Sequence, residues 1–263
     1  MNTPVLLRPY LLLLCLLAAV LYGCNSSEDA AAPVPEPLPK VLVFYKTAGF
    51  SHPSIPDAIT ALRQLGAANR FGVDTTKVAA NFTPAVLAKY KAVIFLSTTG
   101  DVLNEVQQQA FEQYIGAGNG FVGIHAATDT EYDWPWYNGL VGAYFNGHPA
   151  IQPATLNVVD KNHDATASLP DQWQRTDEWY NFRDLSADVR VLLTLDERSY
   201  SGGMHGNDHP IAWYHGYRSG RAFYTAGGHT TESYQEPLFR QHLLGGIQYA
   251  AGLSKRVLEP VMD

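Results

Sequence analysis

The sequence of 263 residues contains only two cysteines, and both lie within the first 24 positions. A domain formed by the residues after Cys24 therefore has no thiolate nucleophile, disulfide, iron–sulfur cluster or cysteine-ligated zinc. Histidine, carboxylate, hydroxyl and lysine groups remain for reactive chemistry. Because all nine histidines fall between His52 and His242, histidine sites are the first candidates for function.

An excess of basic residues is also missing: 18 Lys and Arg stand against 25 Asp and Glu, for a formal net charge of −7. Nucleic-acid-binding domains are normally basic, so we expect no nucleic-acid partner. The glycines form no GxGxxG or Walker pattern, so no nucleotide cofactor is expected. After residue 39 no apolar run approaches the ~20 residues that span a bilayer.

Residues 1–24 are typical of a lipoprotein signal peptide. Arg8 supplies a positive charge, residues 11–23 form an apolar run, and the segment ends in LYGC (21–24), which is similar to a bacterial lipobox. We expect lipidation of Cys24, export, and attachment through the lipid to the periplasmic or cell-surface face of a membrane. Ordinary cleavage without a lipid, or an uncleaved anchor, would fit the same pattern.

Three further segments follow the signal peptide. Residues 25–39 (NSSEDAAAPVPEPLP) form a linker of proline, alanine and acidic residues with almost nothing that a core could bury. Residues 40–253 form one expected domain, in keeping with the ~200–250 residues of many single α/β domains. Residues 254–263 form a C-terminal tail.

The pattern of apolar residues predicts an α/β fold with three layers, in which helices cover both faces of a mostly parallel sheet, as in flavodoxin-like proteins. Short apolar strands at 41–45, 71–75, 92–96 and 121–124 alternate with helices at 55–66, 84–89 and 104–116. The later strands, expected at 155–159, 189–195, 211–214 and 222–225, are separated by turns, and a helix at 237–251 closes the domain.

Ligands of such sheets bind beyond the carboxyl ends of the strands. His52, His125 and His229 each follow a predicted strand, so we expect them at one edge of the sheet. His125 would be a metal ligand or a general acid/base, or a histidine that hydrogen-bonds its turn. Together with His52 and His229 it would form a site for one divalent metal (Zn, Mn or Ni) with a position open for catalysis. Otherwise His52 and His229 cap loops.

The segment GFVGIHA (120–126) resembles the nucleophile elbow of class I glutamine amidotransferases, with His125 where those enzymes have cysteine. This departure matches the trehalose-utilisation (ThuA-like) family, which the chain resembles over roughly residues 40–253. The matching segments are VLVFYKTAGFSHPSIPDAI (41–59), GIHAATDTEYDWPWYNGLVGAYF (123–145), RTDEWYNF (175–182), DHPIAWYH (208–215) and GRAFYTAGGHTTESYQEPLFRQHLLGGIQYAAG (220–252). The resemblance implies a class I glutamine amidotransferase-like fold and a role in carbohydrate metabolism, with a small-molecule sugar or glycoside as partner. It aligns His125 with the family's elbow histidine.

Three residues are candidates for acid–base catalysis: His125, Glu178 and Asp129. Glu178 lies in TDEWYNF (176–182), where burial among aromatic rings would disfavour its ionised form and suit a general acid or base. Asp177 is its rival for this role. The alternative is that Glu178 is an exposed carboxylate beside core aromatics.

Candidate substrate-binding residues combine polar groups with aromatic faces that pack against sugar rings. They are Lys46, Trp134, Trp136, Trp179, Tyr180, Asp208 and His209. Trp134 and Trp136 belong to an expected aromatic–acidic loop that begins at Asp129, although large aromatics are as often part of a core. We interpret His148, His163, His205, His215 and His242 as surface or structural residues.

Two classes of function follow from these observations. In the first, the protein is an enzyme that hydrolyses, cleaves or isomerises a glycoside or keto-sugar by acid–base chemistry of His125 and Glu178, assisted by a divalent metal. In the second, it is a carbohydrate-binding module at the cell surface without turnover. Cysteine-dependent amidotransferase or peptidase activity is excluded by the missing thiol, whatever the fold. The oligomeric state does not follow from the sequence.

Overall fold

The computed structural model describes residues 37–254. The predicted signal peptide with Cys24, most of the predicted linker and nearly all of the predicted C-terminal tail lie outside the described residues. Within residues 37–254, no helix combines the length and the apolar character needed to cross a membrane.

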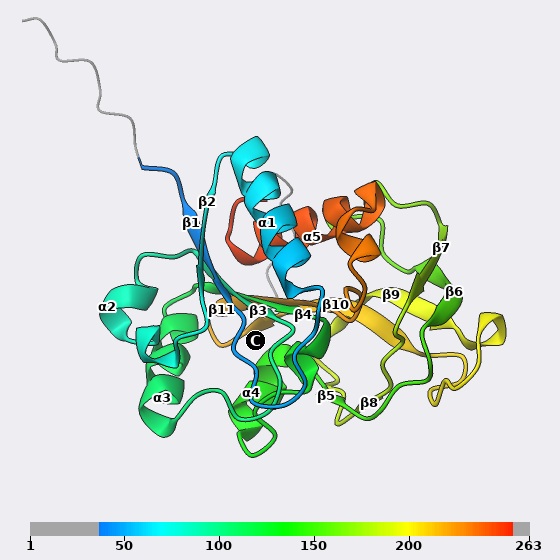
Figure 1. Cartoon of the computed structure of the whole chain (residues 1–263), viewed down its shortest axis with the longest axis horizontal. Helices are drawn as coiled ribbons and strands as arrows, with labels where there is room; N and C mark the ends of the chain where they lie inside the picture. The colour runs from blue at the N-terminus through cyan, green and yellow to red at the C-terminus, as the bar shows by residue number, and fades with distance from the viewer. Residues whose placement is uncertain (1–36, 255–263) are drawn as a thin grey trace, which may run out of the picture. The chain divides into compact units, whose positions relative to one another are not determined.

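A nine-stranded sheet organises the domain (Figure 1). Its strands are β1 (Lys40–Phe44), β2 (Gly72–Thr76), β3 (Ala92–Leu96), β4 (Gly120–Ile124), β6 (Gln152–Val158), β7 (Gln172–Asp177), β9 (Arg190–Asp196), β10 (Pro210–Tyr217) and β11 (Gly220–Thr225). They lie in the order β2-β1-β3-β4-β11-β10-β9-β6-β7. The first five strands in this order are parallel, and the remaining four continue the sheet in antiparallel pairs. A separate antiparallel pair joins β5 (Tyr144–Phe145) to β8 (Phe182–Arg183).

Helices cover both faces of the sheet (Figure 1). On one face lie α1 (Ile55–Asn69) and α5 (Pro237–Ala250), and on the other lie α2 (Pro84–Leu87), α3 (Glu105–Gly116) and α4 (Pro135–Val141). Short 3-10 turns occur at Ala79–Asn81, His125–Thr128, Glu197–Ser199 and Glu232–Tyr234. The predicted three-layer α/β fold is therefore confirmed, with its parallel strands in one half of a mixed sheet.

The parallel strands are apolar along their length because helices cover both of their faces. Every residue of β3 and β4 is buried, and only Lys40 of β1 is exposed. Helix α5 packs so closely on β4 that a Cβ atom at Gly120 would collide with the backbone of Ala250. Strand β4, which His125 directly follows, is therefore held in the centre of the sheet.

The sequence pattern does not predict the strands β5, β7 and β8 or the helix α4. The inward-facing residues of β7 are Trp173, Arg175 and Asp177, and two charged residues among three hide the alternation of a half-buried strand. The prediction of an aromatic–acidic loop that begins at Asp129 is also wrong in part, because the residues from Pro135 onward form the helix α4.

Candidate active site

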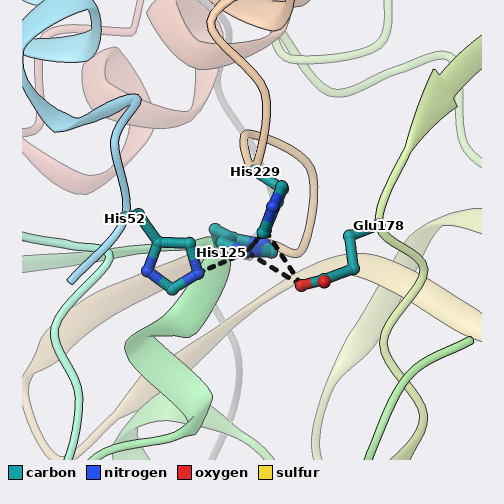
Figure 2. A group of neighbouring side chains, drawn as sticks. All are labelled: His52, His125, Glu178 and His229. Atoms are coloured by element: carbon teal, nitrogen blue, oxygen red, sulfur yellow. Dashed lines mark hydrogen bonds and ion pairs between the residues drawn. The ribbon is translucent and has the colours of Figure 1, made fainter. Parts of the chain in front are cut away.

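The ends of four strands bring His52, His125, His229 and Glu178 together (Figure 2). His52 lies in the loop after β1, His125 directly follows β4, His229 lies in the loop after β11, and Glu178 directly follows β7. One ligand atom from each residue lies within 4.8 Å of the other three. We call these residues the His3Glu cluster. It contains the three histidines that the sequence places at strand ends, with Glu178 as a fourth member.

His125 adopts a left-handed backbone conformation, with a φ angle of 53°. A left-handed conformation is uncommon for a non-glycine residue and costs about 1–3 kcal/mol. The Tyr224 hydroxyl donates a hydrogen bond to the His125 carbonyl oxygen at 2.8 Å, which holds the turn. The chain therefore makes a sharp elbow at the position where the GFVGIHA segment predicts one.

The His125 ring is oriented by a backbone carbonyl. Its Nδ1 atom lies 2.7 Å from the carbonyl oxygen of Ala226. Because a carbonyl oxygen only accepts hydrogen bonds, Nδ1 carries the hydrogen. In the neutral ring Nε2 is then the unprotonated nitrogen, which is the form that binds metals.

Three polar groups meet at this one nitrogen. His125 Nε2 lies 3.1 Å from His52 Nε2, 3.2 Å from His229 Nδ1 and 3.1 Å from the Tyr180 hydroxyl. A single lone pair cannot accept three well-formed hydrogen bonds. The convergence of several nitrogen atoms on a ring whose other nitrogen donates to a carbonyl is typical of histidines arranged around a metal ion.

Glu178 is an ionised carboxylate that bridges the histidines. Its Oε2 atom lies 3.0 Å from His229 Nδ1 and 3.5 Å from His125 Nε2. Burial raises the pKa of this carboxyl, but the hydrogen bonds and charges of His125 and His229 outweigh burial and hold the pKa below its ordinary value. The expectation that burial favours a protonated Glu178 is therefore wrong, because imidazole nitrogens face the carboxylate.

The pKa values of two histidines of the cluster, His52 and His229, are shifted in opposite directions. Burial, reinforced by the neighbouring His125 and His229, lowers the pKa of His52 to about 3, so its ring is neutral near pH 7. The hydrogen bond to Glu178 raises the pKa of His229. A metal ion bound at His229 Nδ1 would displace the proton that this nitrogen shares with Glu178.

The cluster fits a divalent metal ion. Ligand atoms around a tetrahedral ion with bonds of ~2.0–2.1 Å lie about 3.3 Å apart. Four of the separations between ligand atoms of the cluster fall between 3.0 and 3.5 Å. Imidazole with carboxylate is a donor set that suits first-row metals such as Zn, Mn and Ni. The chemistry of the donors and their spacing therefore agree with the predicted divalent cofactor.

Asp177, the predicted rival of Glu178, has a structural position. Its carboxylate is fully buried and accepts hydrogen bonds from the backbone N–H groups of Glu178, Gly228 and His229. Arg175 lies 3.2 Å from the same carboxylate. Asp177 therefore connects two members of the cluster without facing the pocket described next.

A pocket of about 250 Å³ opens over the His3Glu cluster. It is lined by Phe50, His52, Asp129, Phe145, His148, Glu178, Tyr180 and His229. The rings of Phe145 and Tyr180, with centroids 4.4 Å apart, form an aromatic wall. Burial raises the pKa of Asp129, which lies in the same pocket but outside the cluster. The pocket thus combines ring faces with hydrogen-bonding groups.

Of the predicted substrate-binding residues, the structure places Tyr180 in this pocket, and six others lie elsewhere. Lys46 Nζ donates a hydrogen bond to the carbonyl oxygen of Val102 at 2.7 Å, so the ammonium group binds the loop that contains Val102. Trp179 is fully buried and donates to the carbonyl oxygen of Gln152. Asp208 is exposed on the surface away from the pocket lining. These three residues therefore do not line the pocket over the His3Glu cluster.

Trp134 and Trp136 also lie outside the pocket. Their rings stack on each other with centroids 4.9 Å apart. Trp134 donates from Nε1 to Glu112 of α3, and Trp136 packs against Tyr217. Both are parts of the packing around α3 and α4, and neither ring lines the pocket over the His3Glu cluster.

His209 contacts the pocket only through another residue. It is fully buried, and its Nε2 donates to the carbonyl oxygen of Tyr180 at 2.8 Å. Its Nδ1 lies 2.8 Å from Glu197 and 3.0 Å from the Tyr200 hydroxyl. His209 therefore supports the backbone of Tyr180 and does not line the pocket itself.

His148, Phe50 and Phe145 line the pocket although the sequence does not identify them. The sequence predicts a surface or structural role for His148, and its side chain is 41% exposed, but its Nδ1 lies 3.0 Å from Glu178 Oε1. No spacing in the chain connects residue 148 with residue 178. The only signal for Phe50 is that it lies two positions before a candidate ligand, His52. His215 and His242 are buried and hydrogen-bond backbone carbonyls, in line with their structural interpretation.

The fold is that of class I glutamine amidotransferase-like α/β proteins, and His125 lies at the sharp turn that follows the central strand β4. The family model described as "ThuA: Trehalose utilisation" matches residues 40–250. The chain belongs to this family, whose description places it in carbohydrate metabolism. No match was found among curated protein sequences.

Solved structures with the same fold include two ThuA-like proteins. One, from Bacteroides uniformis, is 25% identical with a TM-score of 0.70, and the match covers 86% of this chain and 96% of that one. The other, from Parabacteroides merdae, is 23% identical with a TM-score of 0.69, and covers 85% of this chain and 93% of that one. A GMP synthase component from Thermoplasma acidophilum, 16% identical over 82% of this chain and 95% of that one, has a TM-score of 0.53. This last likeness reflects the shared fold alone.

Proposed function

We propose that this protein is a metal-dependent enzyme that acts on a sugar or glycoside, in particular a keto-sugar, by acid–base chemistry. One observation carries the proposal. The elbow residue His125 has its Nδ1 hydrogen committed to Ala226 O, and its Nε2 faces His52, His229 and Tyr180 within 3.2 Å. In class I glutamine amidotransferases the elbow presents a nucleophile. In this protein the elbow would instead present a nitrogen atom that binds the metal ion.

In this proposal the His3Glu cluster holds one divalent ion. When bound, the ion would polarise a carbonyl or hydroxyl oxygen of the substrate as a Lewis acid. Tyr180 would orient the same oxygen, because its hydroxyl lies 3.1 Å from His125 Nε2. Burial keeps the pKa of Tyr180 well above its usual value, so this hydroxyl stays a hydrogen-bond donor near pH 7.

Asp129 and His148 are the groups placed to move a proton, because both line the pocket and neither belongs to the cluster. His148 Nδ1 lies 2.9 Å from Pro149 O and 3.0 Å from Glu178 Oε1. Both neighbours only accept, so Nδ1 carries the hydrogen and Nε2 of the neutral ring is a base. Burial raises the pKa of Asp129, which favours proton exchange at its carboxyl. Removal of a hydrogen beside a sugar carbonyl would use these groups directly.

The test combines metal analysis with a proton-exchange assay. The full chain, purified without chelators, is expected to hold about one divalent ion per chain. His125→Ala should lose the ion, whereas His242→Gln, at a buried histidine outside the cluster, should keep it. The wild-type protein should also exchange the hydrogen beside the carbonyl of a keto-glucoside in deuterated buffer, followed by NMR. Sugar binding without exchange or product would favour the non-catalytic binding module, and an equal metal content in His125→Ala would refute the metal site.

We also propose that the protein is exported and anchored to a membrane through a lipid on Cys24, on the periplasmic or cell-surface side. The LYGC sequence (21–24) after an apolar run supports this. Cys24→Ser should move the protein from the membrane fraction to the soluble fraction of cells. A wild-type protein that is soluble and carries no lipid by mass spectrometry would contradict this proposal.

A further inference from the structure

Phe50 is a large apolar side chain left exposed at the edge of the pocket. It is 61% exposed and lines the pocket. Its ring stands edge-on to the His52 ring, with centroids 4.8 Å apart and an interplanar angle of 87°. Most of the Phe50 ring therefore faces solvent next to a member of the His3Glu cluster.

The loop that carries Phe50 is anchored to the end of β3 through Thr99. Ala48 N donates to Thr99 O at 2.8 Å, and Gly49 N donates to Thr99 Oγ1 at 3.2 Å. Thr99 Oγ1 in turn donates to Phe50 O at 2.9 Å. The position of Phe50 is thus set by several hydrogen bonds to a buried residue. Because the backbone of this loop is already held, a ligand that packs on Phe50 has to order only the side chain.

The pocket has room for a small ligand only. Its volume of about 250 Å³ lies below the ~300–1,000 Å³ of pockets for drug-sized molecules. A single sugar ring matches this size better than a disaccharide. The remainder of a glycoside would therefore lie at the mouth, where Phe50 exposes its ring.

The charges of the lining residues favour an uncharged ligand. Two carboxylates, Asp129 and Glu178, line the pocket, and no Lys or Arg is among its lining residues. A divalent ion in the His3Glu cluster would balance these two negative charges, so the pocket would carry little net charge. Phosphate or carboxylate groups on a sugar normally require arginine, lysine or clustered N–H donors.

We propose that Phe50 is a specificity-determining residue, which packs its ring against the outer sugar ring of a neutral glycoside whose inner ring enters the pocket. This inference rests on the proposed function. The apolar C–H face of a pyranose would cover the exposed ring of Phe50. Phe145 and Tyr180 would face the inner ring, beside the cluster.

The experiment compares binding of trehalose and glucose to the metal-loaded full chain by calorimetry. Wild-type protein should bind the disaccharide more tightly, and Phe50→Ala should weaken trehalose binding about tenfold with little change for glucose. Phe50→Trp should restore trehalose binding. Val106→Ala, which removes an apolar side chain 74% exposed on α3, is the matched control and should behave as wild type. Metal content, measured on each variant, should not change.

Several results would overturn the inference. Equal trehalose affinity in Phe50→Ala and wild type would reject the role of Phe50 and leave the proposed function standing. Loss of metal in Phe50→Ala would mean that the ring supports His52 instead of a sugar. Tighter binding of glucose 6-phosphate than of glucose would reject the neutral substrate class. Metal-loaded wild-type protein that binds neither sugar would overturn this inference together with the carbohydrate part of the proposed function.

Discussion

Asp177 accepts a hydrogen bond from the backbone N–H of His229 at 3.1 Å through the same oxygen, Oδ1, that accepts the backbone N–H of Glu178 at 2.9 Å. Its other oxygen accepts from Gly228 N and from Ser233 Oγ at 2.9 and 3.0 Å. One buried carboxylate therefore ties the end of β7 to the loop after β11. Two members of the His3Glu cluster depend on it for their backbone positions.

The variant Asp177→Asn tests this connection. The asparagine amide would direct N–H hydrogens at N–H donors that bind a carboxylate oxygen in the wild-type protein. The substitution also removes one charged partner of the buried Arg175. We expect a loss of about 3 kcal/mol in the free energy of unfolding and a metal affinity about 10–100-fold weaker. Chemical denaturation and competition with a chelator measure the two effects.

Asp171→Asn is the matched control, because Asp171 pairs with Lys161 at the surface, where ion pairs contribute little. It should leave metal affinity unchanged. If Asp177→Asn loses stability but binds metal as tightly as wild type, the carboxylate supports the fold and does not position the cluster.

The variant Tyr180→Phe separates holding the metal from catalysis. The Tyr180 hydroxyl lies next to His125 Nε2 but is not one of the four ligand groups. We therefore expect the metal content to stay at the wild-type level. Turnover of a keto-sugar should fall about 100-fold, as for the loss of one donor to a developing negative charge.

Tyr217→Phe serves as the comparison, since its hydroxyl bonds to Trp136 O far from the pocket. It should have wild-type turnover. Loss of the metal from Tyr180→Phe would instead make the hydroxyl a part of the metal site. Unchanged turnover would remove Tyr180 from the mechanism.

Removing the charge of Glu178 should lower the pKa of His229. The hydrogen bond with Glu178 is the main cause that raises this pKa, and burial opposes it. In Glu178→Gln the burial effect remains, so the pKa of His229 should fall below its value in the wild-type protein. NMR titration of the ring signals in metal-free protein measures the shift.

Glu105→Gln, at an exposed position in the first turn of α3, should leave the His229 titration unchanged. A His229 pKa that stays constant in Glu178→Gln would show that the ion pair contributes nothing in solution. Metal affinity should also fall in Glu178→Gln, because a donor oxygen of the cluster is weakened.

The sequence predicts the parallel half of the fold well, because each strand there is identified by a short segment of neighbouring residues. β3 and β4 are continuous apolar runs, and each precedes a turn with polar residues. Strand ends in a parallel sheet share one edge, so the order of strands and loops alone predicts that His52, His125 and His229 are neighbours. The elbow at His125 follows in the same way from a strand that runs into small residues.

The rest of the site depends on contacts between distant parts of the chain. Arg175 and Asp177 of β7 are buried as an ion pair, so a strand built around them has no apolar alternation. The direction of the Glu178 pKa shift depends on His125 and His229, which are 53 and 51 residues away along the chain. Burial alone, which the sequence suggests, would raise this pKa instead of lowering it. Trp134 and Trp136 are a similar case, because composition cannot distinguish a packed ring from a sugar-binding one.

A pH dependence of stability follows from His242 of α5. Its Nδ1 donates to Ala165 O at 2.9 Å, and its Nε2 is buried without a partner among residues 37–254. Burial lowers the pKa of His242 from 6.5 to about 3. Between these two values the unfolded chain binds one more proton than the folded chain, so stability is complete above pH 6.5 and decreases as the pH falls toward 3. The slope for one proton is about 1.4 kcal/mol per pH unit.

The measurement is the free energy of unfolding from urea titrations between pH 7.5 and 4.5, with a chelator present so that metal binding does not contribute. His242→Gln replaces the ring with a side chain that cannot be protonated. This variant should be less stable than wild type at pH 7.5. Its free energy of unfolding should also change less steeply with pH, by up to the slope expected for one proton. Three other histidines should leave a residual slope of the same sign: His52, whose pKa is lowered to about 3, and His205 and His215, whose pKa values burial also lowers. A slope equal to that of wild type in His242→Gln would show that this buried ring does not titrate on unfolding.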